Sequence, residues 1–289
     1  MKLNSQDRPQ TGAEALRWAV SFLEERGFAP QAARQEARLL LAKAWQKNTL
    51  QILIEPEANL DCPTWEKYAS FIKKRGDCIP LHYLLEEKEF MSLPFKVSPS
   101  VLIPRWDTEV LVEEALKLLR NQENPRILDL GTGSGIIAIS LAYYLPQAVV
   151  VATDLCPQAL EIARENAFKL GVAARIKFLE GHLFTPLHQD EQFDVIASNP
   201  PYLSAEEMKD LPSDVRNEPL VALAGGKDGL AYYRAMAPEV KKYLAPEGHF
   251  LVEIGWQQAL SVVGILQEQG LAPLRILCDL EGRDRVVVY

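Results

Sequence analysis

The sequence predicts an α/β protein with a mostly parallel sheet, preceded by a small helical bundle and a linking β-hairpin. Residues 11 to about 77 carry only helical periodicity, and residues 78–103 contain two short strand-like segments around a turn. From Arg126 onward, apolar strands alternate with helical stretches, which is typical of a parallel sheet covered on both faces. With 289 residues, of which 48% are hydrophobic, the chain can form more than one core.

These changes of pattern predict three parts: a helical bundle over residues 1–78, a linker with a hairpin over 79–104, and a sheet domain over 105–289. In the bundle, Thr11 and Glu14 have the spacing of a capping box, and Gly27 ends that first helix. The other helices of the bundle are predicted over Pro30–Trp45, over Thr49–Ile54, and from Asp61 to Gly76.

Short apolar runs predict the strands. The hairpin is assigned to the segment around Tyr83 to Phe90 and to Leu93–Val97. The predicted strands of the sheet are Ile127–Leu130, Val149–Ala152, Ile176–Phe178, Phe193–Ala197 and His249–Ile254. The last two segments, Leu274–Cys278 and Arg285–Tyr289, lie close together in sequence and are expected to form an antiparallel pair at one edge.

The charge of the chain is unevenly distributed. Residues 1–85 carry 12 basic and 10 acidic residues, a net +2, whereas residues 86–289 carry 19 and 29, a net −10. Binding of a long nucleic acid requires clustered Lys and Arg that neutralise phosphates. We therefore expect no direct, sequence-specific binding of nucleic acid.

Composition also disfavours membrane association and metal binding. No apolar run reaches the roughly 18 residues of a transmembrane helix, and the polar residues 1–10 lack the apolar core of a signal peptide. We therefore expect a cytoplasmic protein, and we expect it to be a monomer. No metal site or disulfide framework is predicted, because the four cysteines show no C-x-x-C spacing and the four histidines no H-x-x-x-H spacing.

A glycine-rich loop follows the first predicted strand of the sheet. Gly131, Gly133 and Gly135 form the pattern G-x-G-x-G, and a helix begins directly after them. The dinucleotide fingerprint would need glycine where Ile136 stands, so the loop fits a nucleotide-like ligand without a pyrophosphate. Asp154 ends the next strand, where a carboxylate can accept hydrogen bonds from both hydroxyls of a ribose. The alternative is a tight turn with an incidental surface carboxylate.

The fourth predicted strand of the sheet ends in the tetrad Asn199-Pro200-Pro201-Tyr202. Ligands of open α/β sheets bind beyond the carboxyl ends of strands where the strand order switches, and the first and fourth strands flank that point. The tetrad is therefore expected to face the ligand held by the glycine loop. A proline turn that merely closes a strand is the alternative.

The tetrad suits the methylation of a planar nitrogen by a sulfonium donor, S-adenosylmethionine. An amide nitrogen attacks poorly because its lone pair is delocalised, and two acceptors placed against its N–H bonds would orient it and stabilise the growing positive charge. The Asn199 side-chain oxygen and the Pro200 carbonyl can be these acceptors, since proline presents carbonyls rigidly. Tyr202 offers an aromatic face to the flat group.

These residues resemble the amino methyltransferases that act on sp2 nitrogens, and over most of the chain the release-factor glutamine methyltransferases of bacteria and organelles. The matching segments are Phe95–Val97, Val101–Arg105, Asp107–Glu109, Leu128–Gly135, Ala152–Asp154, Asn199–Tyr202, Glu218–Pro219, Ala222–Leu223, Gly225–Leu230, Glu253–Gly255 and Arg285–Val287.

The resemblance implies a seven-stranded, Rossmann-like S-adenosylmethionine-dependent methyltransferase sheet with an N-terminal helical domain that docks the substrate. It implies methylation of the glutamine in the Gly-Gly-Gln motif of class 1 peptide-chain release factors, giving N5-methylglutamine and S-adenosylhomocysteine. The residues that it assigns to the cofactor are Gly131, Thr132, Gly133, Ser134, Gly135, Asp154, Leu183 and Asn199. Those that it assigns to catalysis and to binding the glutamine are Asn199, Pro200, Pro201 and Tyr202.

Three positions depart from the family pattern: Trp106 replaces a proline, Glu86 a glycine, and His182 an acidic residue expected near the adenine. His182 either contacts the adenine in another way or is a solvent-facing loop residue. Two other activities share the tetrad, namely glutamine methylation of a ribosomal protein and N6-adenine methylation of DNA. The second requires base flipping and normally a basic recognition domain, which this chain lacks.

Overall fold

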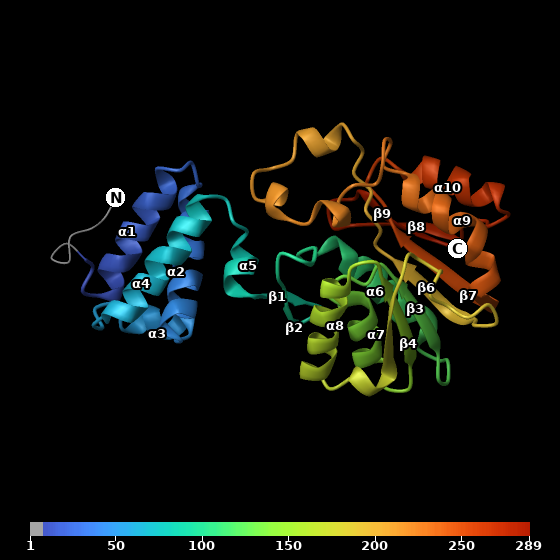
Figure 1. Cartoon of the computed structure of the whole chain (residues 1–289), viewed down its shortest axis with the longest axis horizontal. Coiled ribbons are helices and arrows are strands. Elements are labelled where there is room, and N and C mark those ends of the chain that lie inside the picture. Colours follow the sequence, from blue (N-terminus) through green and yellow to red (C-terminus); the bar gives the residue numbers. More distant parts are fainter. Residues whose placement is uncertain (1–7) are drawn as a thin grey trace. The chain divides into compact units, whose positions relative to one another are not determined.

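The computed structural model describes residues 8–289 and divides into two compact units (Figure 1). The first unit contains the N-terminal helices, up to Glu86, together with the distant segment Ser213–Asn217. The second contains residues 87–212 and 218–289. The polar N-terminal stretch that argued against a signal peptide lies, up to residue 7, outside the described residues. No helix in the described part of the chain is long and apolar enough to cross a membrane.

The first unit is helical. Its helices are α1 (Gly12–Glu24), α2 (Pro30–Trp45), α3 (Thr49–Ile54), α4 (Cys62–Gly76) and α5 (Leu81–Leu85). Side chains of Thr11, Asn48 and Asp61 cap α1, α3 and α4 by accepting from an amide of the first turn. Leucine and alanine stripes on α1 and α2 pack with aromatic residues of α4 into one core, as the sequence periodicity predicts.

The prediction of a strand beginning near Tyr83 is wrong, because Tyr83 lies in the single-turn helix α5. Pro80 precedes this helix with extended backbone angles, and Glu86 ends it in the left-handed region with φ 59°. The apolar run suits a short buried helix as well as a strand, so periodicity alone could not separate them. The hairpin itself is present, with β1 (Glu87–Phe90) antiparallel to β2 (Leu93–Lys96).

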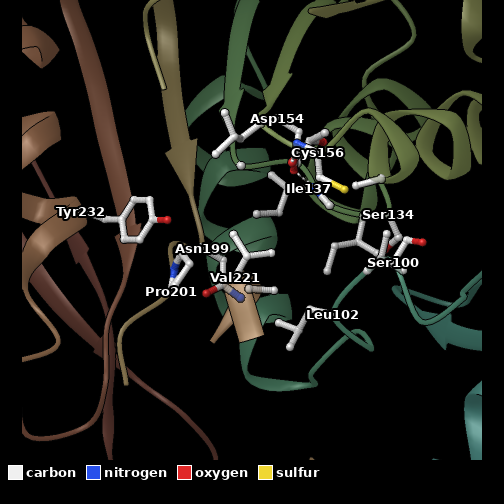
Figure 2. Close-up of a pocket in the computed structure, with 18 of the residues that line it drawn as sticks. Ser100, Leu102, Ser134, Ile137, Asp154, Cys156, Asn199, Pro201, Val221 and Tyr232 are labelled. Atoms are coloured by element: carbon white, nitrogen blue, oxygen red, sulfur yellow. Dashed lines mark hydrogen bonds between the residues drawn. The ribbon is translucent and has the colours of Figure 1, made fainter. Parts of the chain in front are cut away.

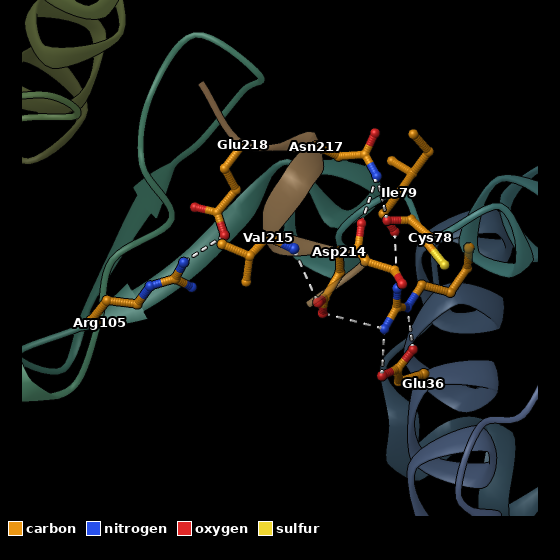
Figure 3. Close-up of polar contacts among 10 residues, drawn as sticks. Glu36, Cys78, Ile79, Arg105, Asp214, Val215, Asn217 and Glu218 are labelled. Atoms are coloured by element: carbon orange, nitrogen blue, oxygen red, sulfur yellow. Dashed lines mark hydrogen bonds and ion pairs between the residues drawn. The ribbon is translucent and has the colours of Figure 1, made fainter. Parts of the chain in front are cut away.

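The segment Ser213–Asn217 contacts residues of the helical unit (Figure 3). The Asn217 side-chain amide donates to the Cys78 carbonyl at 3.0 Å. Arg75, which is buried, donates to the Glu36 carboxylate at 2.6 Å and lies 3.9 Å from the carboxylate of Asp214. The segment is therefore held by Arg75 of α4 and by the backbone of Cys78, which follows α4.

The second unit contains the predicted seven-stranded sheet, as counted over residues 8–289. Its order is β5-β4-β3-β6-β7-β9-β8, in which only β9 runs antiparallel to its two neighbours, β7 and β8. The strands are β3 (Arg126–Leu130), β4 (Val149–Asp154), β5 (Ile176–Glu180), β6 (Phe193–Ser198), β7 (Leu244–Glu253), β8 (Arg275–Cys278) and β9 (Asp284–Val288). The predicted fold class is confirmed, including the antiparallel pair at the edge.

Helices cover both faces of this sheet (Figure 1). They are α6 (Asp107–Leu119), α7 (Ile136–Tyr144), α8 (Pro157–Lys169), α9 (Ala231–Tyr243) and α10 (Ala259–Glu268), with 3-10 turns at Ala173–Arg175, Glu207–Lys209, Val215–Asn217 and Leu220–Ala222. Strand residues alternate between the faces: Ile127 packs with α6 and α7, and its neighbour Leu128 packs with α9 and α10. The strands β3 and β6 lie side by side. The glycine loop follows β3 and the tetrad follows β6, so the switch in strand order falls between these two segments.

Candidate active site

A cavity of about 340 Å³ opens at the carboxyl ends of β3, β4 and β6 (Figure 2). This volume lies within the range of small-molecule sites. Its walls come from the loop after β2, the glycine loop, the end of β4, the loop after β5, the tetrad and the start of α9. The lining residues are Ser100, Val101, Leu102, Pro104, Arg105, Gly131, Thr132, Gly133, Ser134, Ile136, Ile137, Asp154, Leu155, Cys156, Ala159, Gly181, His182, Leu183, Asn199, Pro201, Val221, Ala222 and Tyr232.

The glycine loop needs its glycines for conformation and for space. Gly131, Gly133 and Gly135 have φ values of 72°, 56° and 87°, which other residues rarely adopt. A Cβ on Gly135 would also lie 2.5 Å from Cδ1 of Ile139. The loop therefore turns sharply into α7 and exposes its backbone to the cavity.

Asp129, in β3, holds this loop through two hydrogen bonds. Its Oδ2 accepts from the Thr132 hydroxyl at 2.6 Å and from the Ala138 backbone N–H at 3.1 Å. The carboxyl is fully buried, and this burial raises its pKa to about 7 although both hydrogen bonds lower it. Asp129 thus holds the loop to the first turn of α7.

Asp154 lies in the cavity wall at the end of β4. Its two carboxylate oxygens accept backbone N–H bonds from Gly133 and Cys156, each at 2.8 Å. Burial raises its pKa, while these bonds lower it. Both bonds fix the carboxylate against the glycine loop, at the position predicted to receive ribose hydroxyls.

The tetrad follows β6, which pairs with β3, so it lies beside the glycine loop. Ser198 joins the two strand ends, because its hydroxyl donates to the Leu130 carbonyl at 2.9 Å. The Asn199 side-chain Nδ2 donates to Oγ1 of Thr108 at 3.0 Å. This bond occupies the amide nitrogen of Asn199 and leaves its Oδ1 to accept from another group.

The backbone of the tetrad is held from behind by a second glycine segment and by Gln258. The Tyr202 carbonyl accepts from Gln258 Nε2 at 2.9 Å. A Cβ on Gly225 would lie 2.8 Å from the Pro201 oxygen, and one on Gly229 would lie 2.3 Å from the Tyr202 oxygen. Only glycine permits this close packing, which makes the tetrad rigid.

The structure brings most of the predicted site residues together. The cavity is lined by eight of them, namely Gly131, Thr132, Gly133, Ser134, Asp154, Leu183, Asn199 and Pro201. Gly135, Pro200 and Tyr202 do not line it. Tyr202 instead packs, partly buried, against the core beside α9 and α10, and this burial raises the pKa of its hydroxyl.

Sequence reasoning missed Tyr232 and Val221, whose side chains line the cavity (Figure 2). Tyr232 and Tyr233 are adjacent on α9, yet Tyr233 is fully buried in the core while Tyr232 lines the site. Successive residues of a helix point about 100° apart, so when one of two adjacent tyrosines is in the core, the other points elsewhere. This pair was the only signal in the sequence that could have indicated Tyr232. His182 is exposed and lines the cavity, with its ring centroid 6.1 Å from that of Tyr232.

Glu218 supports the wall formed by residues 101–105. Its buried carboxylate accepts from the Ile103 backbone N–H at 3.1 Å and from the Arg105 guanidinium at 2.5 Å (Figure 3). These two bonds hold a segment whose residues Val101, Leu102, Pro104 and Arg105 line the cavity. Among the described residues, no group of three His, Cys, Asp or Glu side chains could hold a metal ion.

The residues present fit S-adenosylmethionine. Asp154 supplies an acceptor for a ribose, and glycine-loop amides and the Ser134 side chain lie in the same wall. Leu102, Leu155 and Leu183 add apolar surface for a flat base. The cavity thus combines the features that a nucleoside with a charged tail requires.

Comparison with known proteins identifies the class. A family model described as a methyltransferase domain matches residues 121–271, and another described as the PrmC N-terminal domain matches residues 14–85. Among solved structures, the hMettl16 catalytic domain in complex with MAT2A 3'UTR hairpin 6 superposes with a TM-score of 0.56 at 16% identity, covering 76% of this chain and 91% of that one. A methyltransferase from Pyrococcus furiosus gives 0.51 at 18% identity, covering 70% and 90%. The fold is that of a methyltransferase, and the chain contains a methyltransferase domain.

Relatives that match along nearly the whole chain define the family. The release factor glutamine methyltransferase of Moorella thermoacetica is 43% identical, over 94% of this chain and 95% of the relative. That of Geobacter sulfurreducens is 40% identical, over 95% and 94%. The chain belongs to the release factor glutamine methyltransferase family.

Proposed function

We propose that this protein methylates the side-chain amide nitrogen, N5, of the glutamine in the Gly-Gly-Gln motif of class 1 peptide-chain release factors. S-adenosylmethionine is the methyl donor, and the products are N5-methylglutamine and S-adenosylhomocysteine. The observation that carries the proposal is the orientation of Asn199, whose Nδ2 is bonded to Thr108 and whose Oδ1 is left for a substrate N–H. Membership of the family supports the choice of substrate.

In this mechanism, Asn199 Oδ1 and the Pro200 carbonyl accept the two N–H bonds of the glutamine amide. The two acceptors orient the nitrogen and stabilise the positive charge that it gains. S-adenosylmethionine, when bound, supplies an electrophilic methyl group on a sulfonium. The nitrogen would take the methyl group as the carbon–sulfur bond breaks with its electron pair on sulfur, and the released N–H proton would pass to solvent. Pro201 and Tyr202 complete the rigid turn that presents the acceptors.

The cofactor is assigned to the wall opposite the tetrad. Asp154 would accept from the ribose hydroxyls, and residues 131–135 would receive the charged tail along the exposed backbone of their loop. Leu183, which lies in the loop after β5, would contact the base, and Asn199 would close the site between cofactor and glutamine. The fit rests on the cavity that most of these residues share.

The N-terminal bundle, residues 1–78, is assigned to docking of the release factor, with residues 79–104 as the linker and 105–289 as the methyltransferase domain. We further propose that the protein acts in the cytoplasm as a monomer, without direct sequence-specific contacts to nucleic acid. The net charge of −10 over residues 86–289 supports the last point.

The test is transfer of labelled methyl from S-adenosylmethionine to an unmodified release factor, beside a factor whose Gly-Gly-Gln glutamine is replaced by alanine. The Asn199→Ala enzyme serves as the catalytic control, and calorimetry with S-adenosylhomocysteine verifies that it still binds cofactor. We expect label on the wild-type factor only, and loss of roughly 10²-fold or more in rate with Asn199→Ala.

Absence of label on the release factor, with cofactor binding intact, would contradict this substrate. Label on a ribosomal protein or on adenine in DNA would then identify which other planar nitrogen is methylated. Gel filtration with light scattering measures the mass in solution and so tests whether the protein is a monomer. The mass of a dimer would contradict the proposed oligomeric state and leave the proposed activity unaffected.

A further inference from the structure

The buried side chain of Thr108, in helix α6, contacts Asn199 of the tetrad. It lies in the first turn of α6 and is fully buried. Its Oγ1 accepts from Asn199 Nδ2 at 3.0 Å. A hydroxyl has a single proton to donate, so this contact leaves the Thr108 proton for a different acceptor.

Glu253, at the end of β7, is the acidic side chain beside Thr108. Its carboxyl is only 1% exposed, and burial raises its pKa to about 7 although the Thr108 side chain lowers it. Its Oε2 has no hydrogen-bond partner among the described residues. The charges that act on it come from Asp107, Arg105 and Arg285, and Arg285 is itself paired with Asp107 at 3.1 Å.

The chain Glu253–Thr108–Asn199 has a fixed direction when Glu253 is ionised. A carboxylate only accepts, so an ionised Glu253 favours the Thr108 rotamer that directs its proton toward Glu253 and offers its lone pair to Asn199. The side chain of Asn199 can meet that lone pair only with its nitrogen. The two ends of an amide are nearly identical in shape, so packing alone would not select between them.

We propose that Thr108 and Glu253 are positioning residues, which fix the Asn199 amide with its oxygen toward the substrate. This inference rests on the proposed function, because the oxygen is the end that an amide N–H requires. In the reversed orientation Asn199 would present N–H groups to the N–H groups of the glutamine. The nitrogen would lose one of its two acceptors, and the reversed state would be unproductive.

The first test compares Thr108→Val with Thr108→Ser. Valine keeps the volume and removes the hydroxyl, whereas serine keeps it. We expect Thr108→Val to lower kcat roughly 10- to 100-fold with an unchanged dissociation constant for S-adenosylhomocysteine. Thr108→Ser should retain most of the wild-type kcat. Glu253→Gln should also lower kcat, because a glutamine can donate to Thr108 and reverse the chain.

Ser140→Ala is the control. Ser140 is fully buried in α7 of the same unit, and its Oγ has no partner among the described residues. This substitution removes a buried hydroxyl that orients no tetrad residue and should leave kcat unchanged. Equal kcat values for Thr108→Val and Ser140→Ala would overturn the proposal.

The second test does not depend on activity. In protein labelled with ¹⁵N-asparagine, the side-chain NH₂ signal of Asn199, assigned by its loss in Asn199→Ala, should exchange slowly with water in wild type and Thr108→Ser. It should exchange at least tenfold faster in Thr108→Val. Equal exchange rates would refute the positioning role even if the wild-type enzyme methylated a different substrate, and absent transfer with the expected exchange pattern would refute the substrate alone.

Discussion

The side-chain amide of Asn166 forms two hydrogen bonds with the backbone of Lys96. The Lys96 N–H donates to Oδ1 of Asn166 at 2.7 Å, and Nδ2 of Asn166 donates to the Lys96 carbonyl at 3.0 Å. The same Nδ2 donates to the Ser134 carbonyl at 2.9 Å. One buried residue of α8 therefore joins the hairpin strand β2 to the glycine loop.

We predict that Asn166→Ala destabilises the protein by about 2–3 kcal/mol, because it leaves buried backbone groups without partners. The affinity for S-adenosylhomocysteine should fall with it, since Ser134 loses its support. Urea unfolding and calorimetry measure the two effects. The exposed Asn121→Ala is the control, and equal stability of the two variants would show that the Asn166 bonds contribute little.

Replacement of Asp154 by alanine should weaken cofactor binding roughly 10- to 100-fold, because the site loses the proposed ribose acceptor and the bonds that hold the Gly133 and Cys156 amides. Calorimetric titration with S-adenosylhomocysteine gives the change. Asp190→Ala, which removes a largely exposed carboxylate, should bind as wild type does. An unchanged affinity of Asp154→Ala would remove Asp154 from the cofactor site.

The raised pKa of Asp129 predicts a pH dependence of stability. Its pKa is about 7 in the folded protein and near 3.8 when exposed, so between these values the folded state keeps a proton that the unfolded state has released. The contribution of this group is therefore complete below about pH 4 and is lost as the pH rises to about 7. Asp129→Asn does not titrate. The free energy of unfolding of wild type relative to Asp129→Asn, without cofactor, should fall across this window, whereas parallel profiles would contradict the assigned shift.

Gly229→Ala should cost both stability and turnover. Gly229 has φ 77°, and a Cβ there would lie 2.3 Å from the Tyr202 oxygen, so the tetrad backbone would have to move. Gly171→Ala is a matched control, because Gly171 has φ 73° with no atom within 4 Å of its Cβ position. We expect Gly171→Ala to cost about 1 kcal/mol and to keep its kcat, and Gly229→Ala to lose more of both. Identical unfolding curves and rates would exclude the steric effect.

Much of the site follows from sequence because each residue lies at a strand end whose position local patterns define. Gly131, Asp154 and Asn199 follow apolar runs of β3, β4 and β6, and parallel strands bring their carboxyl ends to one edge. The turn of helix at Tyr83 was mistaken for a strand, because a short apolar run suits either conformation.

The contacts that could not be predicted join residues far apart in the chain. Thr108 and Asn199 are separated by 91 positions, and nothing local to Thr108 distinguishes it from a helix-capping threonine. Tyr232 likewise needs the packing of α9 to reveal which of two adjacent tyrosines faces the cavity. Such pairings depend on the assembled sheet, not on periodicity.

The segment Ser213–Asn217 makes the helical unit discontinuous in sequence. The polypeptide passes from one unit to the other after Glu86, before Ser213 and after Asn217. An excised fragment 1–86 would therefore lack the segment 213–217, which belongs to the same unit. The complementary fragment would carry Asp214 and Asn217 without the Arg75 and Cys78 groups that partner them. Gene fragments divided at residue 86 should therefore reassociate when expressed together, each supplying what the other is missing.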